Sequence, residues 1–132
     1  MDKSHYSFTL DFKVRDYECD IQGIVNNSVY QNYLEHARHE FLISRGMDFA
    51  ALAHEGIHLV VTRVELHYKS SLRSGNHFWV GLTAARKGKV GFSFQQDIYH
   101  QDGRLAVAAV VEGASLNAKG RPFFMPELDT LL

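Results

Sequence analysis

The chain lacks the residues that would mark a secreted or membrane-spanning protein. Cys19 is the only cysteine among 132 residues, so no internal disulfide can form, as is usual in a reducing compartment. No apolar run approaches the ~20 residues of a membrane-spanning helix. The N-terminal stretch MDKSHYSFTLDFKVRDY has polar residues where a signal peptide has its apolar centre. We therefore expect a cytoplasmic protein with no membrane span.

Clustered basic residues are also missing. The formal net charge is -1, and the lysines and arginines are scattered along the chain, whereas a nucleic-acid-binding surface gathers them in a patch. We therefore expect no nucleic-acid partner. The length suits a single domain, residues 1–132, and no repeat or linker divides it. Low net charge and many aromatic residues are compatible with a homo-oligomer, because association covers surface that a small domain leaves exposed.

The apolar residues that are present change period along the chain. Residues 7–15 alternate between apolar and polar, as in a half-buried strand. A helix is expected over residues 28–45, opened by a capping box of Ser28 and Gln31 and closed by Gly46. A second, short helix or turn is expected over residues 49–55. The apolar positions of the long helix recur at helical spacing: Tyr30, Tyr33, Leu34, Ala37, Phe41 and Leu42.

Four further strands are expected over residues 58–72, 77–86, 90–100 and 104–116. Short turns join most of them, and strands joined by tight turns are antiparallel. The order predicts the α+β class, with one long helix over one face of an antiparallel sheet. The other face then needs a partner or water, and the small or apolar residues on both sides of the last strand favour a partner.

The segment DYECDIQGIVNNSVYQNYLEHAR, residues 16–38, carries the candidate site. Asp20 precedes the helix start, and Gly23 permits a tight bend between them. The first N–H groups of a helix lack internal partners and carry partial positive charge. Donors of this kind beside a carboxylate suit hydrolysis of an activated acyl group. The alternative is structural: Asp20 caps a turn, and Asn26 and Asn27 supply local hydrogen bonds.

The pattern D-x-x-G-I-V-N-N-x-x-Y-x-x-Y-x-E-x-A-R, residues 20–38, resembles the signature of the hotdog-fold acyl-CoA thioesterases, the 4-hydroxybenzoyl-CoA thioesterase-like group. The order of elements is similar over nearly the whole chain. Residues 64–76 resemble the family's second strand and following turn, and residues 120–127 resemble its usual end. The resemblance implies a hotdog fold: a curved antiparallel sheet of about five strands wrapped around one long central helix.

The same resemblance implies an activity and a site. The expected reaction is hydrolysis of an acyl-CoA to the free acid and CoA, with Asp20 as general base or nucleophile. The backbone N–H groups near Gly23, Ile24 and Val25, at the start of the helix, would polarise the thioester carbonyl. Asn26 would hydrogen-bond to substrate or water. No cofactor is implied, since CoA is part of the substrate, and two chains would join sheets edge to edge, as a homodimer or homotetramer.

Further substrate-binding candidates carry weaker signals. Tyr30 is expected to line an acyl pocket or to belong to the core. Lys69 and Arg73, near the turn after the second strand, would hold CoA phosphates or lie in solvated turns. Asn27 is a further candidate for substrate binding.

Four other features are expected to be structural. Glu35 and Arg38 have the spacing of an ion pair on the helix. Asp16 and Glu18 are expected to face solvent or a subunit contact. No metal site is expected, because His36 and His39 lack further convergent ligands. Cys19 is expected to be a small core residue.

Three other functions fit parts of the pattern. A non-catalytic acyl-thioester-binding module would use the same pocket, and an acyl-acyl carrier protein (ACP) thioesterase would use the same chemistry. A hydratase ranks last, because Asn26 occupies the position where that chemistry needs a histidine.

Overall fold

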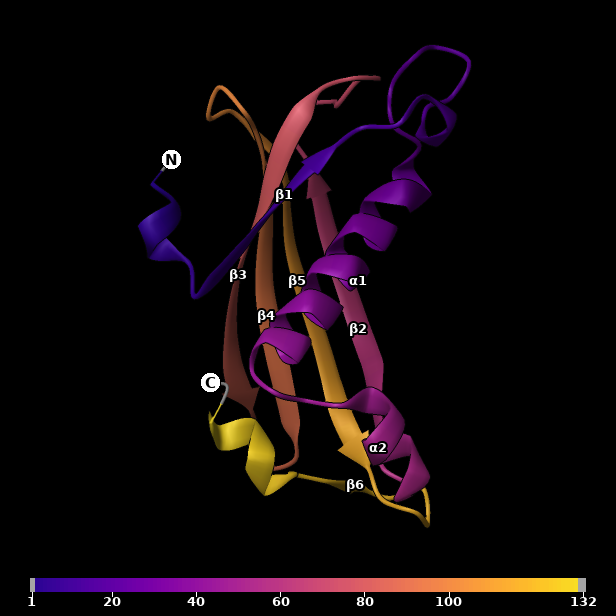
Figure 1. Cartoon of the computed structure of the whole chain (residues 1–132), viewed down its shortest axis with the longest axis vertical. Coiled ribbons are helices and arrows are strands. Elements are labelled where there is room, and N and C mark those ends of the chain that lie inside the picture. Colours follow the sequence, from indigo (N-terminus) through magenta and orange to yellow (C-terminus); the bar gives the residue numbers. More distant parts are fainter. Residues whose placement is uncertain (1, 131–132) are drawn as a thin grey trace.

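A curved antiparallel sheet packs its concave face against one long helix (Figure 1). The computed structural model describes residues 2–130. The strand order is β1-β3-β4-β5-β2, with the short β6 paired to β5. The bounds are β1 (Phe8–Lys13), β2 (His58–Tyr68), β3 (His77–Lys87), β4 (Gly91–His100), β5 (Leu105–Leu116) and β6 (Pro122–Phe123). This arrangement confirms the predicted α+β class.

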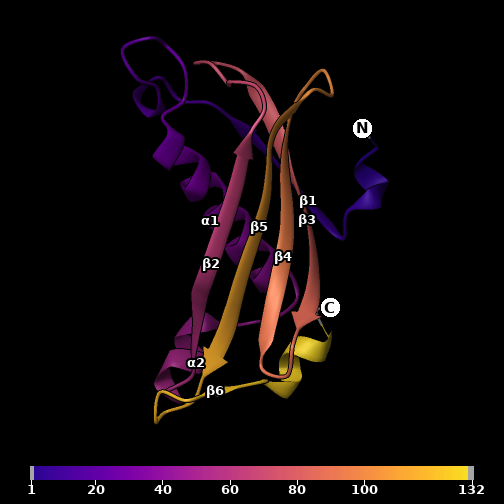
Figure 2. The same cartoon turned by 180° about the vertical axis from the view of Figure 1, so that it is seen from behind.

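The long helix α1 (Asn27–Ser44) is followed by α2 (Phe49–His54). The described residues also form three short 3-10 helices: η1 (Lys3–His5), η2 (Asp16–Glu18) and η3 (Pro126–Thr130). No helix among residues 2–130 combines the length and the apolar character needed to cross a membrane. Figure 2 shows the sheet from the side opposite α1.

The side of α1 that faces the sheet carries the predicted apolar stripe. All six positions named from the helical period are buried: Tyr30, Tyr33, Leu34, Ala37, Phe41 and Leu42. Tyr30, Tyr33 and Leu34 belong to one core cluster with β3 and β5, and Phe41 and Leu42 belong to a second. Full burial of a large apolar side chain stabilises a fold by ~1.5–3 kcal/mol, so this stripe fixes the orientation of α1 on the sheet.

The segment between β1 and α1 differs from the expectation at both of its ends. The first strand was expected to reach residue 15, but β1 ends at Lys13, and η2 lies between the strand and Asp20. The predicted capping box at Ser28 is wrong: α1 begins at Asn27, and its N-cap is Asn26. The reason is that the Asn26 N–H is bonded to the Glu18 carbonyl oxygen at 3.0 Å, which fixes where the chain can enter the helix.

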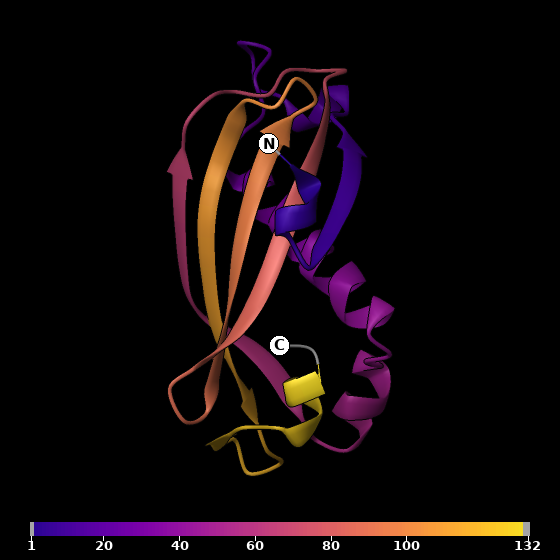
Figure 3. The ribbon, with the colours of Figure 1, turned by 90° about the vertical axis from the view of Figure 1, so that its left-hand side faces the viewer.

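The convex face of the sheet is partly covered by the N-terminal segment (Figure 3). The Tyr6 ring lies over Gly81, and a β-carbon at residue 81 would come within 2.6 Å of it. The Tyr6 hydroxyl donates to Asp97 Oδ2 at 2.6 Å and lies 3.0 Å from the Tyr99 hydroxyl. Burial and the contact with Asp97 raise the pKa of Tyr6. The chain thus covers part of the face that the sequence assigned to a partner or water.

Candidate active site

The candidate site is built on a closed loop, residues 19–25, which we call the site loop. Cys19 and Val25 form an isolated antiparallel bridge at its base. Inside it, the Asp20 N–H donates to the Ile24 carbonyl oxygen at 2.8 Å. Gly23 has φ 82°, a left-handed conformation that glycine adopts at low cost. The tight bend expected at Gly23 is therefore present.

The Asp20 carboxylate is half-buried, and one of its oxygens serves the loop. Oδ1 accepts the Gln22 N–H at 2.8 Å and the Ile24 N–H at 3.4 Å. Among the contacts of residues 2–130, Oδ2 has no hydrogen-bond partner. Asp20 therefore caps a turn, as the structural alternative required, and also keeps one oxygen open for a ligand.

The three N–H groups expected to polarise a carbonyl are already engaged. Gly23 N–H donates to the Asp20 carbonyl oxygen at 3.0 Å, and Val25 N–H to that of Leu72 at 2.9 Å. Ile24 N–H makes its long contact with the Asp20 carboxylate. These internal acceptors make the three N–H groups weaker candidates for binding a ligand carbonyl, and their role stays a prediction.

The free donors lie one step further along the chain. The N–H groups of Asn27 and Ser28, in the first turn of α1, make no hydrogen bond within the described residues. Val29 N–H already returns to the Asn26 carbonyl oxygen at 2.9 Å. The partial positive charge of a helix start is concentrated on such free N–H groups. Developing negative charge on a ligand oxygen fits this position.

Glu18, expected to face solvent or another subunit, is instead buried. Its Oε1 accepts the Tyr33 hydroxyl at 2.8 Å and the Arg15 N–H at 2.7 Å, and its Oε2 accepts Arg15 Nη2 at 3.0 Å. Burial by itself raises the pKa of Glu18, but the hydrogen bonds from Arg15 and Tyr33 lower it overall. Burial and the Glu18 carboxylate raise the pKa of Tyr33. Asp16, the other acid of this segment, is exposed.

Tyr30 is a structural residue in this fold. Its ring is buried, and its hydroxyl oxygen accepts the Leu72 N–H at 3.0 Å. Burial raises the pKa of Tyr30. Leu72 in turn accepts the Val25 N–H, so Tyr30 supports the site loop through Leu72.

Of the two basic candidates, the structure brings one to the site loop. Arg73 forms an isolated bridge with Ile24, and its side chain is exposed. Lys69 is exposed at the end of β2, where its N–H donates to the Ala106 carbonyl oxygen at 2.8 Å. Arg73 is thus the better placed of the two to meet a ligand at the loop.

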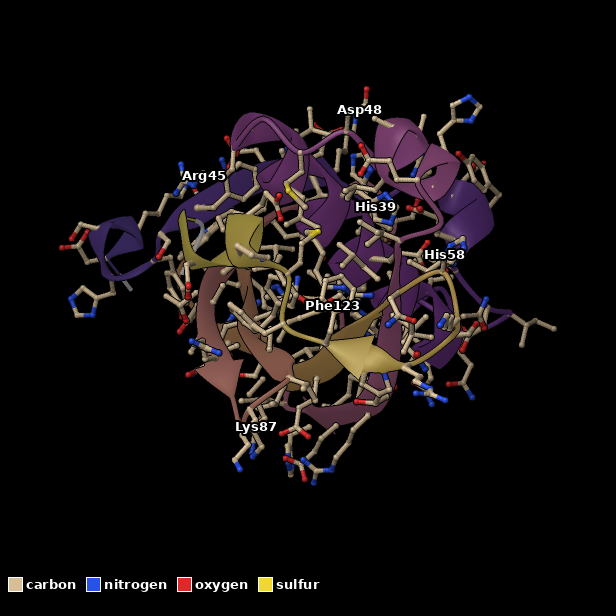
Figure 4. The ribbon with its side chains drawn as sticks, turned by 90° about the horizontal axis from the view of Figure 1, so that it is seen from below. His39, Arg45, Asp48, His58, Lys87 and Phe123 are labelled. Carbon is tan, nitrogen blue, oxygen red and sulfur yellow. The ribbon has the colours of Figure 1, made fainter. Side chains whose placement is uncertain are left out.

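A groove runs between α1 and the β2 edge of the sheet. One hollow of about 210 Å³ is lined mainly by apolar side chains, among them Leu42, Leu59 and Phe94. A second hollow of about 150 Å³ lies toward the helix start and shares Arg38 and Val61 with the first. Figure 4 shows the molecule from below and labels His39 on α1 and His58 at the start of β2.

Arg38 is the one basic side chain shared by both hollows. The expected ion pair with Glu35 is not formed; instead Arg38 Nη1 donates to Gln96 Oε1 at 3.0 Å. Gln96 is fully buried, and its Nε2 donates to the Leu34 carbonyl oxygen at 3.0 Å. Burial lowers the pKa of Arg38, against the opposing influence of Glu35.

Comparison with known proteins assigns the family. Residues 14–128 match the model of the thioesterase-like superfamily. The chain belongs to this superfamily. It is 34% identical over 96 residues to a putative esterase of Aquifex aeolicus, covering 73% of each chain. It is also 45% identical over 82 residues to a chloroplastic acyl-acyl carrier protein thioesterase of Arabidopsis thaliana, covering 58% of this chain but only 43% of that protein.

The fold of this thioesterase-like chain is shared with solved structures. A 1,4-dihydroxy-2-naphthoyl-CoA thioesterase from Synechocystis superposes with a TM-score of 0.88 at 16% identity, over 94% of this chain and 93% of that one. A hypothetical protein from Aquifex aeolicus gives 0.86 at 28% identity, over 95% and 98%. The predicted hotdog fold and the predicted family are confirmed.

A buried histidine anchors the turn that carries Lys69 and Arg73. The Ser70 hydroxyl donates to the Leu105 carbonyl oxygen at 2.8 Å, so its oxygen is left to accept from His100 Nε2 at 2.8 Å. His100 Nδ1 then accepts from Arg104 Nη2 at 3.4 Å. This arrangement requires a neutral imidazole. Burial and the Arg104 charge lower the pKa of His100.

This lowered pKa predicts a loss of stability in acid. The unfolded chain binds a proton at His100 near the ordinary histidine pKa, and the folded protein binds it only at lower pH. Between these two values the unfolded state holds more protons, so the free energy of unfolding falls as pH drops from about 7 to about 5. We expect His100→Gln to weaken this pH dependence. Urea unfolding of both proteins at the two pH values measures it, and equal pH dependences would contradict the prediction.

Proposed function

We propose that the chain hydrolyses the thioester bond of an acyl-CoA. The observation that carries this proposal is the open Oδ2 of Asp20, in a loop joined to the helix start where the Asn27 and Ser28 N–H groups are free. A carboxylate and a pair of free donors are the two elements that acyl transfer to water needs.

The chemistry follows from these groups. The thioester carbonyl oxygen accepts hydrogen bonds from the Asn27 and Ser28 N–H groups, which stabilise the oxyanion as it forms. Asp20 either takes a proton from the attacking water or attacks the carbonyl carbon itself and is released by water in a second step. In both routes the C–S bond breaks, the thiolate leaves and is protonated, and the products are the acid and the thiol.

The groove along α1 is the proposed place for the acyl group. It begins about one helical turn beyond the free N–H groups and is lined mainly by apolar side chains. We propose Arg73, beside the site loop, as a contact for CoA phosphates, with Lys69 as a second candidate. Asn26 remains a candidate for hydrogen bonding to substrate or water.

A second copy of the chain is the proposed cover for the β2 edge. Among residues 2–130, β2 has a strand partner on one side only, β5. Its exposed apolar side chains are Val61, Val64 and Tyr68, with exposed fractions of 50%, 40% and 49%. Edge pairing with another β2 would satisfy the open backbone groups and bury these side chains. It would also close the groove into a pocket.

We expect Val61→Asp to convert this dimer to a monomer at micromolar concentration, because it places a charge on the surface that edge pairing would bury. Val90→Asp is the matched control, since Val90 is an exposed valine, 39% exposed, at the far end of the β3–β4 hairpin. Sedimentation equilibrium measures both masses. A wild type that is monomeric, or a Val61→Asp dimer as tight as wild type, would contradict the proposed edge pairing.

The acyl carrier has a second candidate. Similarity to a plant acyl-ACP thioesterase favours an ACP-bound acyl group. Release of free thiol from short, long and aromatic acyl-CoAs, and from the matching acyl-ACPs, tests both. Turnover of acyl-CoAs supports the leading proposal. Turnover of acyl-ACPs alone would mean that the substrate is carried by ACP and not by CoA. Binding without any turnover would leave a non-catalytic binding module. The cytoplasmic location stays a prediction.

A further inference from the structure

We propose that Glu18 and Tyr33 are positioning residues, which hold the Asp20 carboxylate at a fixed place relative to the first turn of α1. This inference rests on the proposed function, because Asp20 and the first-turn N–H groups are its reacting groups. Neither residue touches the proposed reacting atoms, and both act through the base of the site loop.

Glu18 attaches the chain just before Asp20 to the rest of the protein through both its side chain and its backbone. Its side chain is only 8% exposed and accepts from the Tyr33 hydroxyl, from the Arg15 backbone and from the Arg15 guanidinium. Its carbonyl oxygen accepts the Asn26 N–H at 3.0 Å. One residue therefore ties the approach to Asp20 both to the start of α1 and to its second turn.

Tyr33 provides a rigid point for this attachment. Its ring packs 4.7 Å from the ring of Phe78 and 5.5 Å from that of Phe12, measured between centroids. Tyr33 belongs to the same helix as the free N–H groups of Asn27 and Ser28, and its backbone lies roughly 9 Å along the helix axis from that of Asn27. Glu18 is thus held in a fixed position relative to α1, the helix that carries the free N–H groups.

Apart from Glu18, the site loop is attached mainly at its C-terminal end. There the Val25 N–H donates to the Leu72 carbonyl oxygen at 2.9 Å, and Ile24 forms an isolated bridge with the following residue, Arg73. The tip of the loop, Ile21, is fully exposed, so Glu18 is the main attachment on the side from which the chain enters Asp20. Most hydrogen bonds inside the loop join Asp20 to Gln22, Gly23 or Ile24, so they fix the shape of the loop but not its place on the protein. If the Glu18 attachment is weakened, Asp20 moves relative to the donors. Misplacement of a reacting group by ~1 Å costs about 100-fold in rate.

The chain contains a matched control for Tyr33. Tyr6 also donates its hydroxyl to a buried carboxylate, that of Asp97, at 2.6 Å. This pair joins the N-terminal segment to β4, and the N-terminal segment covers part of the convex face of the sheet (Figure 3). Tyr33→Phe and Tyr6→Phe remove the same kind of hydrogen bond, and only the first should disturb the site.

The kinetic test uses the full chain and the acyl thioester that it turns over best. We expect Tyr33→Phe to lower kcat about 10-fold to 100-fold with KM changed less than about twofold. Tyr6→Phe should change kcat less than about twofold, although its shift in Tm should be similar to that of Tyr33→Phe. In the Asp20→Asn background, Tyr33→Phe should add little. Glu18→Gln, which keeps an oxygen for Tyr33, should retain more activity than Glu18→Ala.

A second measurement needs no substrate. Hydrogen exchange of the Gln22 and Ile24 amides, which bond to Asp20 Oδ1, reports directly on the order of the loop. We expect faster exchange in Tyr33→Phe than in Tyr6→Phe. Equal exchange in the two variants, or equal kcat, would overturn the positioning role. If Asp20→Asn keeps full activity, the proposed function fails, and the exchange result alone decides the inference.

Discussion

Asp20→Asn is expected to lower kcat for thioester hydrolysis by about 10²–10⁴-fold, the usual contribution of a general base. The amide is isosteric with the carboxylate but neither takes a proton from water nor attacks a carbonyl carbon. Its side-chain oxygen still accepts the Gln22 N–H, as Asp20 Oδ1 does at 2.8 Å. The loop should therefore keep its shape, and the loss should report on the charge alone.

Asp16→Asn is the matched control for this variant. Asp16 is an exposed acid four positions earlier, in η2, and its substitution removes the same charge from the same segment. Thiol release by the two variants and the wild type, with circular dichroism to compare folding, completes the test. Full turnover by Asp20→Asn would remove Asp20 from the mechanism. An equal loss of activity in Asp16→Asn would mean that the loss comes from the change in net charge and not from the position of Asp20.

Asn27→Pro is expected to lower kcat by about 10²–10³-fold, because proline has no N–H and one oxyanion donor is lost. The position tolerates the ring: Asn27 is the first residue of α1, where proline is favoured. Asn26 before it has φ -61° and ψ 141°, the conformation that a residue preceding proline prefers. Stability should change little, so activity and folding separate.

Asn27→Ala is the control, since it removes the side chain and keeps the N–H. We expect Asn27→Ala to stay within about threefold of wild type if only the backbone takes part. Thermal unfolding of both variants checks that the start of α1 is intact. Full activity in Asn27→Pro, with an unchanged melting temperature, would mean that the oxyanion is bound elsewhere.

Local periodicity predicted the long helix and the strands, and hence the α+β class, because each element is amphipathic on its own, whereas the hotdog fold was implied by the family resemblance. The six apolar positions from Tyr30 to Leu42 recur at helical spacing, and all are buried against the sheet. Gly46, which was expected to close the long helix, has φ 84° and marks a chain reversal that depends on neighbouring residues alone. These signals need no knowledge of distant contacts.

The site was predicted less completely because its hydrogen bonds join distant residues. Val25 N–H is not free only because Leu72, far along the chain, accepts from it. Glu18 is buried only because Tyr33 and Arg15 meet it. A charged residue in a polar segment is ordinarily exposed, so nothing local distinguished Glu18 from Asp16.

The contact between Tyr6 and Gly81 makes the two positions interdependent. The ring fills the space that any β-carbon at residue 81 would need, and its hydroxyl completes the hydrogen bonding of Asp97. A larger residue at 81 is therefore acceptable only after residue 6 has become small, and that first change leaves Asp97 without its partner. The order in which substitutions accumulate is restricted, so this contact is a source of epistasis between the N-terminal segment and the centre of the sheet.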